Sequence, residues 1–293
     1  MQTVSRLRTS LLSYLEVTKP RIWLLLVFTA FSAMIVASAG RIQLETMLLM
    51  LAAVTLGSAS ADTLTSYIDR DIDSVMNRTR LRPIPTRRIH PAVKAMYFGV
   101  FLASLALITS YIINTLSFVL MSLGLVDNIV IYSKILKRRN PVSIILGGFS
   151  GGIPSLIGYA SVTNSIDFVS ITMAGLVVLW IPSHIWSLAL HSREDYQRAN
   201  IPMLPLVVSE AKAVRCIAST SILMVLFSVA PFIMGAFGMI YLYTASFSGA
   251  IMLIISFWLL AKPSKSKAWL LFKLSSPYLA LVFLAMVIDR LMS

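Results

Sequence analysis

Three aspartates follow the second long apolar segment of the sequence, and their spacing suits metal-dependent phosphate chemistry. Asp69, Asp71 and Asp73 occupy alternate positions directly after residues 46–67. In a helix, Asp69 and Asp73 share one face with their side chains about 6 Å apart. Carboxylates this close repel each other unless a cation lies between them, and Mg2+ is often held by one or two carboxylates together with substrate phosphate oxygens. The spacing therefore predicts a Mg2+ site that serves a phosphorylated substrate.

Arginines follow these acids in the same polar stretch. Arg78 and Arg82 carry planar guanidinium groups, which can contact two phosphate oxygens at once. Carboxylates for a metal beside guanidiniums for phosphate indicate a diphosphate ligand. We expect Pro83, Pro85 and Pro91 to keep the following stretch extended rather than helical. An alternative without a binding role is a solvated helix end, whose aspartates and arginines pair with each other among the lipid headgroups.

Further ionisable residues lie within or directly after apolar stretches. Asp62 precedes Asp69 by one heptad on the same predicted helix face, and Asp127 lies ten residues before Lys137. Charged groups inside a membrane are costly and usually have a function, although a buried, hydrogen-bonded or protonated carboxyl would also explain Asp62. Lys137 and Arg138 either contact phosphate or anchor the end of their segment by their positive charge.

A second polar group ends the sixth apolar segment. His184 and Trp186 lie within residues 168–190, and Asp195 follows them. Asp195 supplies a second carboxylate that could face the first acidic cluster, and a pair of Mg2+ ions between them would stabilise a leaving pyrophosphate. For His184 three roles remain open: a ligand to a metal or haem iron, a proton donor, or a core histidine bonded to a carbonyl.

Composition indicates a membrane protein. The chain is 57% hydrophobic and only 13% charged, whereas soluble domains carry about 25% charged residues. The net charge of +13 is concentrated between apolar segments, which argues against a nucleic-acid partner. The single cysteine, Cys216, excludes an intrachain disulfide framework and a cysteine-cluster metal site.

A bilayer is crossed by about 20 apolar residues in a helix. The sequence therefore predicts an all-α fold, a single-domain polytopic membrane bundle over residues 1–293 with about nine transmembrane helices. The expected spans are residues 22–40, 46–67, 94–113, 116–133, 142–162, 168–190, 212–236, 239–260 and 274–292.

The basic residues predict the orientation of this bundle. With nine spans, all but two of the 25 basic residues fall on one side, and the exceptions are Arg41 and Arg290. Because basic loops stay in the cytoplasm, the N-terminus is expected there and the C-terminus outside. The acidic clusters share the basic side, so we expect a site that faces the cytoplasm in the cell (cytoplasmic) membrane.

Taken together, these residues resemble the UbiA superfamily of intramembrane prenyltransferases, and within it the branch of haem O synthases (protohaem IX farnesyltransferases). The acidic motif of the family, Asn-x3-Asp-x3-Asp, falls on Thr65, Asp69 and Asp73, so threonine stands where the family usually has asparagine. Asp62 is a candidate to supply the missing polar contact. The resemblance to the haem O synthase branch rests on residues 132–138, 182–186 and 195–205.

The resemblance implies a nine-helix bundle with a central cavity open to lipid. It implies a prenyltransferase with farnesyl diphosphate as donor, haem B as a substrate rather than a cofactor, and Mg2+ as the cofactor. Expected partners are membrane lipids and a haem A synthase that would take up the product. The metal ligands would be Asp69, Asp73 and Asp195, which together with Arg78 would form the catalytic group.

The remaining implied contacts concern the two substrates. The diphosphate would be bound by Arg78, Arg82, Lys137, Arg138 and Thr65. Haem or the prenyl chain would contact His184, Tyr67, Tyr132, Trp186 and Asp62. Two alternatives stay open: a prenyltransferase that acts on a quinone precursor or another lipid, and a membrane transporter, which would also explain acids inside the membrane.

Overall fold

The computed structural model describes residues 2–292, and the side chains from Ser10 onward. Within these residues the fold is all-α, without strands, and nine helical segments are long and apolar enough to cross a membrane. The predicted spans are thereby confirmed. The segments are α2 (Pro20–Ser38), α3 (Leu44–Ile68), α5 (Val93–Ile113), α6 (Thr115–Leu125) with η1 (Val126–Leu136), α7 (Ser143–Leu146) with α8 (Phe149–Thr163), α9 (Phe168–His191), α12 (Glu210–Phe227) with α13 (Ala230–Ile233), α14 (Met239–Ala261) and α15 (Lys265–Met292).

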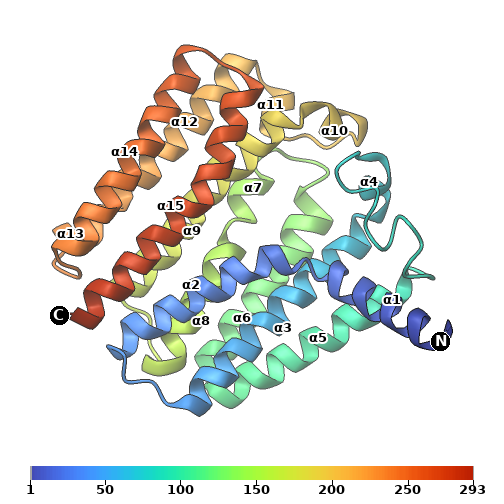
Figure 1. The fold of residues 1–293 in the computed structure, drawn as a ribbon, viewed down its shortest axis with the longest axis horizontal. Helices are drawn as coiled ribbons and strands as arrows, with labels where there is room; N and C mark the ends of the chain where they lie inside the picture. Colours follow the sequence, from blue (N-terminus) through green and yellow to red (C-terminus); the bar gives the residue numbers. More distant parts are fainter. Residues whose placement is uncertain (1, 293) are drawn as a thin grey trace.

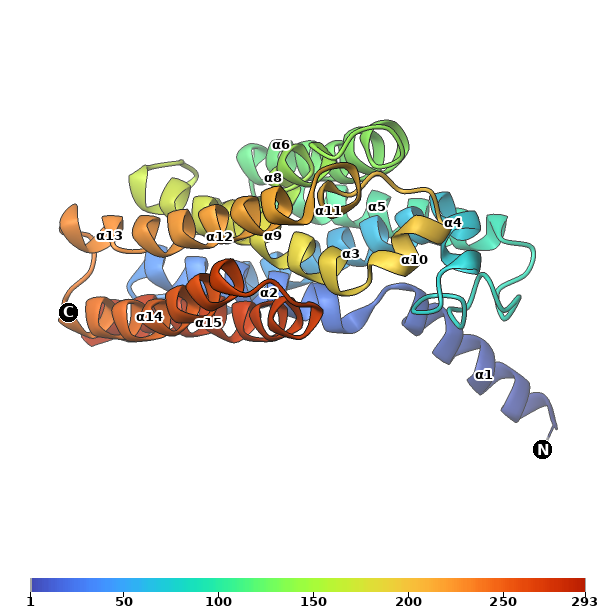
Figure 2. The same ribbon diagram turned by 90° about the horizontal axis from the view of Figure 1, so that it is seen from above.

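Shorter helices lie at one end of the bundle. Figures 1 and 2 show α4 and α10 together at this end, whereas α13 and the C-terminus lie at the opposite end. We call the end with α4 and α10 the site end. α1 projects away from the bundle there (Figure 2). The short helices are α1 (Gln2–Val17), α4 (Arg70–Val75), α10 (Arg193–Arg198) and α11 (Leu204–Val207).

The two largest buried cores of the described residues lie in the two halves of the bundle. One lies mainly among α9, α12, α14 and α15 and includes Tyr241 and Phe283. The other lies among α2, α3, α5, α6 and α8 and includes Met34 and Met50. α4 continues from α3, and α10 continues from α9. The site end therefore receives one acidic segment from each half of the bundle.

The last helix begins nine residues before the predicted start at 274, so that boundary was wrong. Lys265, Lys267 and Lys273 lie in the first part of α15, whereas the predicted spans left these lysines in a loop. Trp269 and Phe272 alternate with these lysines and stack on each other at 5.0 Å between ring centroids. An amphipathic helix with lysines on its polar face extends beyond the apolar span, and hydropathy alone misses its start.

The polar stretch after α4 was predicted to be extended, and the structure shows consecutive turns instead. The N–H groups of Arg80 and Arg82 donate to the carbonyls of Met76 and Thr79 at 2.9 and 3.0 Å. Proline fixes only its own φ, near a value that also suits the second position of a β-turn. Prolines in this stretch therefore permitted turns rather than enforcing an extended chain.

The fourth span changes its helical period halfway. From Val126 to Leu136 it is a π-helix, a rare form that is frequent at functional sites. The N–H of Lys137 donates to the carbonyl of Tyr132, five residues earlier, at 2.8 Å. Asp127 accepts a hydrogen bond at 2.9 Å from the N–H of Ser150, in the first turn of α8. Asp127 thus has a structural role in joining two helices.

Candidate active site

Asp69 lies at the junction of α3 and α4. Its N–H donates to the carbonyl of Thr65 and its own carbonyl accepts from the N–H of Asp73, each at 2.8 Å. Hydrogen bonds of the helical type thus continue through the junction. Asp69 and Asp73 are each only 5% exposed, whereas Asp71 between them is exposed. Burial thus separates Asp69 and Asp73 from the middle aspartate.

Lys137 forms an ion pair with Asp69. Its Nζ donates to Oδ2 of Asp69, and both side chains are largely buried. Burial on its own lowers the pKa of Lys137, but the neighbouring Tyr132 and Asp69 outweigh it and hold this pKa above its usual value. The other carboxylate oxygen, Oδ1 of Asp69, is buried and has no hydrogen-bond partner in the described chain. Buried oxygens are nearly always satisfied, so this atom is available to a cation.

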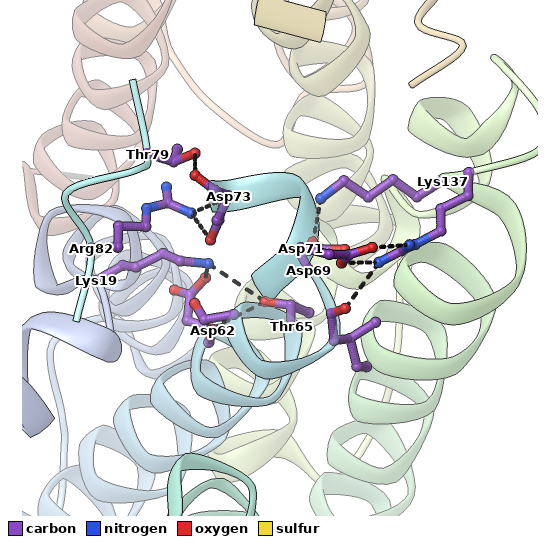
Figure 3. Close-up of polar contacts among 12 residues, drawn as sticks. Lys19, Asp62, Thr65, Asp69, Asp71, Asp73, Thr79, Arg82 and Lys137 are labelled. Atoms are coloured by element: carbon purple, nitrogen blue, oxygen red, sulfur yellow. Dashed lines mark hydrogen bonds and ion pairs between the residues drawn. The ribbon is translucent and has the colours of Figure 1, made fainter. Parts of the chain in front are cut away.

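Asp73 pairs with an arginine from the loop that follows α4. Nη1 of Arg82 donates to both carboxylate oxygens of Asp73, at 3.0 and 2.9 Å. Oγ1 of Thr79 donates to the backbone carbonyl of Asp73 at 3.1 Å and holds the loop against α4. Figure 3 shows Asp73 directed toward Arg82 and Asp69 directed toward Lys137 on the other side. The two acids of the motif therefore have separate cationic partners.

Asp71 and Arg138 form a third pair at the surface. Two guanidinium nitrogens of Arg138 donate to the two carboxylate oxygens, each at 2.7 Å. These hydrogen bonds lower the pKa of Asp71 to about 2. The side chain of Asp71 is 62% exposed, so this pair contributes little to stability. Arg138 is nevertheless brought beside the acidic motif.

Asp195 joins α10 to the loop after α4. Its carboxylate oxygens accept hydrogen bonds from the backbone N–H groups of Asn77 at 3.2 Å and Arg78 at 3.1 Å, and Arg198 also donates to it. The acid from the second half of the bundle is thus brought to the arginine loop. Arg78 contributes its backbone to this junction, and its side chain is exposed.

Lys19, which was not among the predicted site residues, neutralises Asp62. Its Nζ lies 3.2 Å from Oδ1 of Asp62 and 3.5 Å from Oγ1 of Thr65. The lysine precedes Pro20 at the start of the first span, and that position was the only signal in the sequence. Thr65, where the family motif has asparagine, thus shares one lysine with Asp62 (Figure 3).

The acidic side chains of the site are the candidate ligands of Mg2+. Within residues 2–292, no three Asp, Glu, His or Cys side chains lie close enough to form a metal cluster. Each acid is instead paired with a lysine or arginine. Mg2+ needs only one or two carboxylates when phosphate oxygens complete its shell. The unpaired Oδ1 of Asp69 therefore fits a Mg2+ ion that is shared with a diphosphate.

The predicted aromatic and histidine contacts lie around this centre rather than in it. His184 is stacked between Trp180 and Phe272 at 4.2 Å from each ring, and Nδ1 lies 2.7 Å from Oγ of Ser275 on α15. Trp186 is buried in the first core. The two predicted tyrosines lie beside basic side chains. The guanidinium of Arg70 lies over the ring of Tyr67, and Nζ of Lys137 is 5.7 Å from the ring centroid of Tyr132.

An apolar cavity of about 110 Å³ lies between α2, α3, α6 and α8. Asp62 lines it together with Asn128 and Ser150, and the rest of its wall is mostly apolar. Asp62 is the link between this cavity and the acidic motif, because it lies two helical turns before Asp69. Neither His184 nor Trp186 lines the cavity.

Comparison with known proteins decides the family. The UbiA prenyltransferase family matches residues 25–285. The chain belongs to this family. It is therefore a multi-pass membrane enzyme that transfers prenyl groups, and the alternative of a transporter is not supported. The matched region includes every acid of the site described above.

Relatives and solved structures agree with this assignment. The chain is 45% identical to "Protoheme IX farnesyltransferase 2" of Cenarchaeum symbiosum (strain A), over 94% of both chains. It is 44% identical to "Protoheme IX farnesyltransferase" of Desulforudis audaxviator, over 94% of this chain and 88% of that one. A structure of digeranylgeranylglyceryl phosphate synthase superposes with a TM-score of 0.81 at 20% identity, over 97% and 99% of the two chains. For a UbiA homolog from Archaeoglobus fulgidus bound to DMAPP and Mg2+, the TM-score is 0.73 at 17% identity, over 94% and 99%.

Replacement of Lys137 should reveal the cation site at Asp69. In Lys137→Met the buried carboxylate loses its partner, which costs about 3–5 kcal/mol for a fully buried pair. We expect a lower melting temperature without metal, and a larger rise on addition of millimolar Mg2+ than in the wild type. Thermal unfolding in detergent measures both effects. Lys134→Met, an exposed lysine three residues earlier, is the control, and equal responses to Mg2+ in the two variants would contradict the assignment.

Proposed function

We propose that this prenyltransferase is a haem O synthase, which transfers the farnesyl group of farnesyl diphosphate to a vinyl group of haem B in a Mg2+-dependent reaction. The acceptor is proposed on one observation, the identity of up to 45% over nearly the full length to relatives named protoheme IX farnesyltransferase. The donor is supported by the buried acids and their basic neighbours at the site end. The UbiA homolog solved with DMAPP and Mg2+ binds a ligand of the same chemical class.

The proposed orientation places the site end in the cytoplasm of a cell membrane, with the N-terminus inside and the C-terminus outside. The distribution of the basic residues supports it, because all but two of the 25 lie on the side of α4 and α10. Farnesyl diphosphate and haem B would reach the site from the cytoplasmic leaflet. A haem A synthase is the proposed consumer of the product.

Binding of the diphosphate would exchange partners within the existing ion pairs. Asp69, Asp73 and Asp195 are the proposed ligands of a pair of Mg2+ ions, with one or two of these acids at each ion and phosphate oxygens completing its shell. The cations that now neutralise them would turn to phosphate oxygens. Lys137 and Arg82 are the nearest cations, since both already contact these acids. Further phosphate contacts are proposed for three residues. Arg78 lies on the same loop as Arg82, Arg138 follows Lys137 at the same helix end, and Thr65 belongs to the same motif as Asp69.

The proposed reaction begins with cleavage of the bond between C1 of the farnesyl group and the diphosphate oxygen, whose electron pair leaves with pyrophosphate. Mg2+, when bound, offsets the negative charge of that leaving group. Lys137 and the arginines would donate hydrogen bonds from their N–H groups to the oxygens of the leaving pyrophosphate. C1 then bonds to the terminal carbon of a vinyl group of haem B. Water adds to the neighbouring carbon and loses a proton, which gives the hydroxyethylfarnesyl side chain of haem O.

Aromatic residues are proposed to protect the allylic cation. The ring of Tyr132 lies near Lys137 and therefore near the proposed pyrophosphate, and an aromatic face stabilises a cation. Tyr67, near the end of α3, is the second candidate. Trp186, on α9, is proposed to contact the prenyl chain or haem B. Asp62, in the cavity wall, is proposed to contact the prenyl chain.

His184 is proposed to contact haem B through its second ring nitrogen. Oγ of Ser275 donates to the carbonyl of Phe272 at 2.8 Å, so its lone pairs are left to accept from Nδ1–H of His184 at 2.7 Å. With the neutral ring assigned in this way, Nε2 carries no proton. A histidine that ligates iron is usually oriented in this way by a bond from its other nitrogen.

The proposal is tested with purified protein, farnesyl diphosphate, Mg2+ and either haem B or 4-hydroxybenzoate. We expect a haem of higher mass by one farnesyl group and one hydroxyl group, together with pyrophosphate, and no prenylated 4-hydroxybenzoate. Chromatography with mass spectrometry detects both products. Prenylation of 4-hydroxybenzoate without any change to haem B would contradict the haem acceptor and favour a quinone precursor.

A further inference from the structure

The cavity between α2, α3, α6 and α8 changes in polarity along the bundle. Toward the site end its wall contains Asp62, Asn128 and Ser150. Seven or eight residues away from the site end on the same helices, the wall consists of Val54, Met121 and Ile157. A rise of 1.5 Å per residue makes this distance about 10–12 Å. A ligand with a polar head at the acidic motif and an apolar tail matches this order.

At the far end of the cavity, a methionine of the wall packs on a glycine. Met121 is only 5% exposed and belongs to the second buried core, with Met50 and Ala106. A Cβ atom on Gly57 would lie 2.4 Å from Sδ and 2.8 Å from Cε of Met121. Because position 57 has no side chain, the thioether end of Met121 lies directly against α3. The thioether of Met121 is therefore part of the cavity wall at this end.

We propose that Met121, positioned by Gly57, is the residue that limits the length of the prenyl chain accepted in this cavity. The inference rests on the proposed function, since it assumes a prenyl diphosphate with its head at Asp69. A shorter side chain at 121 extends the space away from the site end. A side chain at 57 displaces the flexible thioether, and the cavity is open volume beside it.

The two positions therefore predict opposite changes in selectivity. Met121→Ala should raise the affinity for geranylgeranyl diphosphate relative to farnesyl diphosphate by about tenfold, since a few carbons in an apolar pocket change selectivity by this order or more. Gly57→Ala should shift the preference toward geranyl diphosphate. Opposite shifts distinguish a length limit from general damage, which would weaken all three ligands alike.

The experiment measures binding of geranyl, farnesyl and geranylgeranyl diphosphates in the presence of Mg2+, by titration calorimetry on the full chain in nanodiscs. Leu123→Ala is the control, because Leu123 is on the same helix, 56% exposed and outside the cavity. Its ratios should equal those of the wild type. If the wild type binds none of the three ligands, the proposed function fails. If the wild type binds them and both cavity variants keep its ratios, only the role of Met121 is wrong.

Discussion

Asp69→Asn is expected to lower the rate of prenyl transfer by about a thousandfold, the order seen when a major source of charge stabilisation is removed from a leaving group or oxyanion. Asparagine keeps the size of the side chain and can still accept from Lys137. It removes the negative charge at the one buried carboxylate oxygen that has no partner in the described chain. The loss of rate should therefore come from metal binding, while the loss of the counter-charge of Lys137 lowers stability as a separate effect.

Three measurements on purified Asp69→Asn separate these causes. The rate of pyrophosphate release reports the chemistry, and titration with farnesyl diphosphate reports binding with and without Mg2+. The melting temperature without metal should fall, because the buried Lys137 loses its counter-charge, so rate and binding are compared at a temperature at which the variant stays folded. We expect the stimulation of binding by Mg2+ to disappear in the variant.

Asp71→Asn is the matched control for Asp69. It changes a carboxylate two residues away that is 62% exposed and pairs with Arg138 at the surface. We expect its rate to stay within a few-fold of the wild type. A similar thousandfold loss in both variants, or an unchanged rate in Asp69→Asn, would show that Asp69 has no special role at the metal.

Gly158→Ala is expected to disrupt the packing of α8 on α2. A Cβ atom at 158 would lie 1.9 Å from the carbonyl oxygen of Ala30 and 2.6 Å from its carbon. Both atoms belong to the backbone of a membrane-spanning helix, so neither can rotate away. Overpacking of this kind typically costs about 1–3 kcal/mol, and here the two helices must move apart. We expect a clearly lower melting temperature and a lower yield of folded protein.

Gly175→Ala serves as the comparison in the same thermal unfolding assay. A Cβ atom there would meet only the ring of Phe227, at 3.0 Å. That ring is half-buried and can shift, so a small change in melting temperature is expected. If the two variants melt at the same temperature, the close approach of α8 to α2 is not important for stability.

The sequence by itself determined the membrane architecture. Spans of about 20 apolar residues between basic loops leave few alternatives, because a backbone in lipid must satisfy its hydrogen bonds within a helix. The spacing of Asp69 and Asp73 and the arginines after them was equally informative. Helix ends were less predictable, as the lysines of α15 show.

Only the tertiary structure decided which groups meet. Asp195 reaches the N–H groups of Asn77 and Arg78 across 118 and 117 residues of sequence, and Lys19 pairs with Asp62 across 43. No local pattern encodes these contacts, since they depend on how the spans pack against one another. The cavity lined by Met121 arises in the same way, from side chains on four separate helices. Helical periodicity fixes the face on which a residue lies, whereas packing decides what that face contacts.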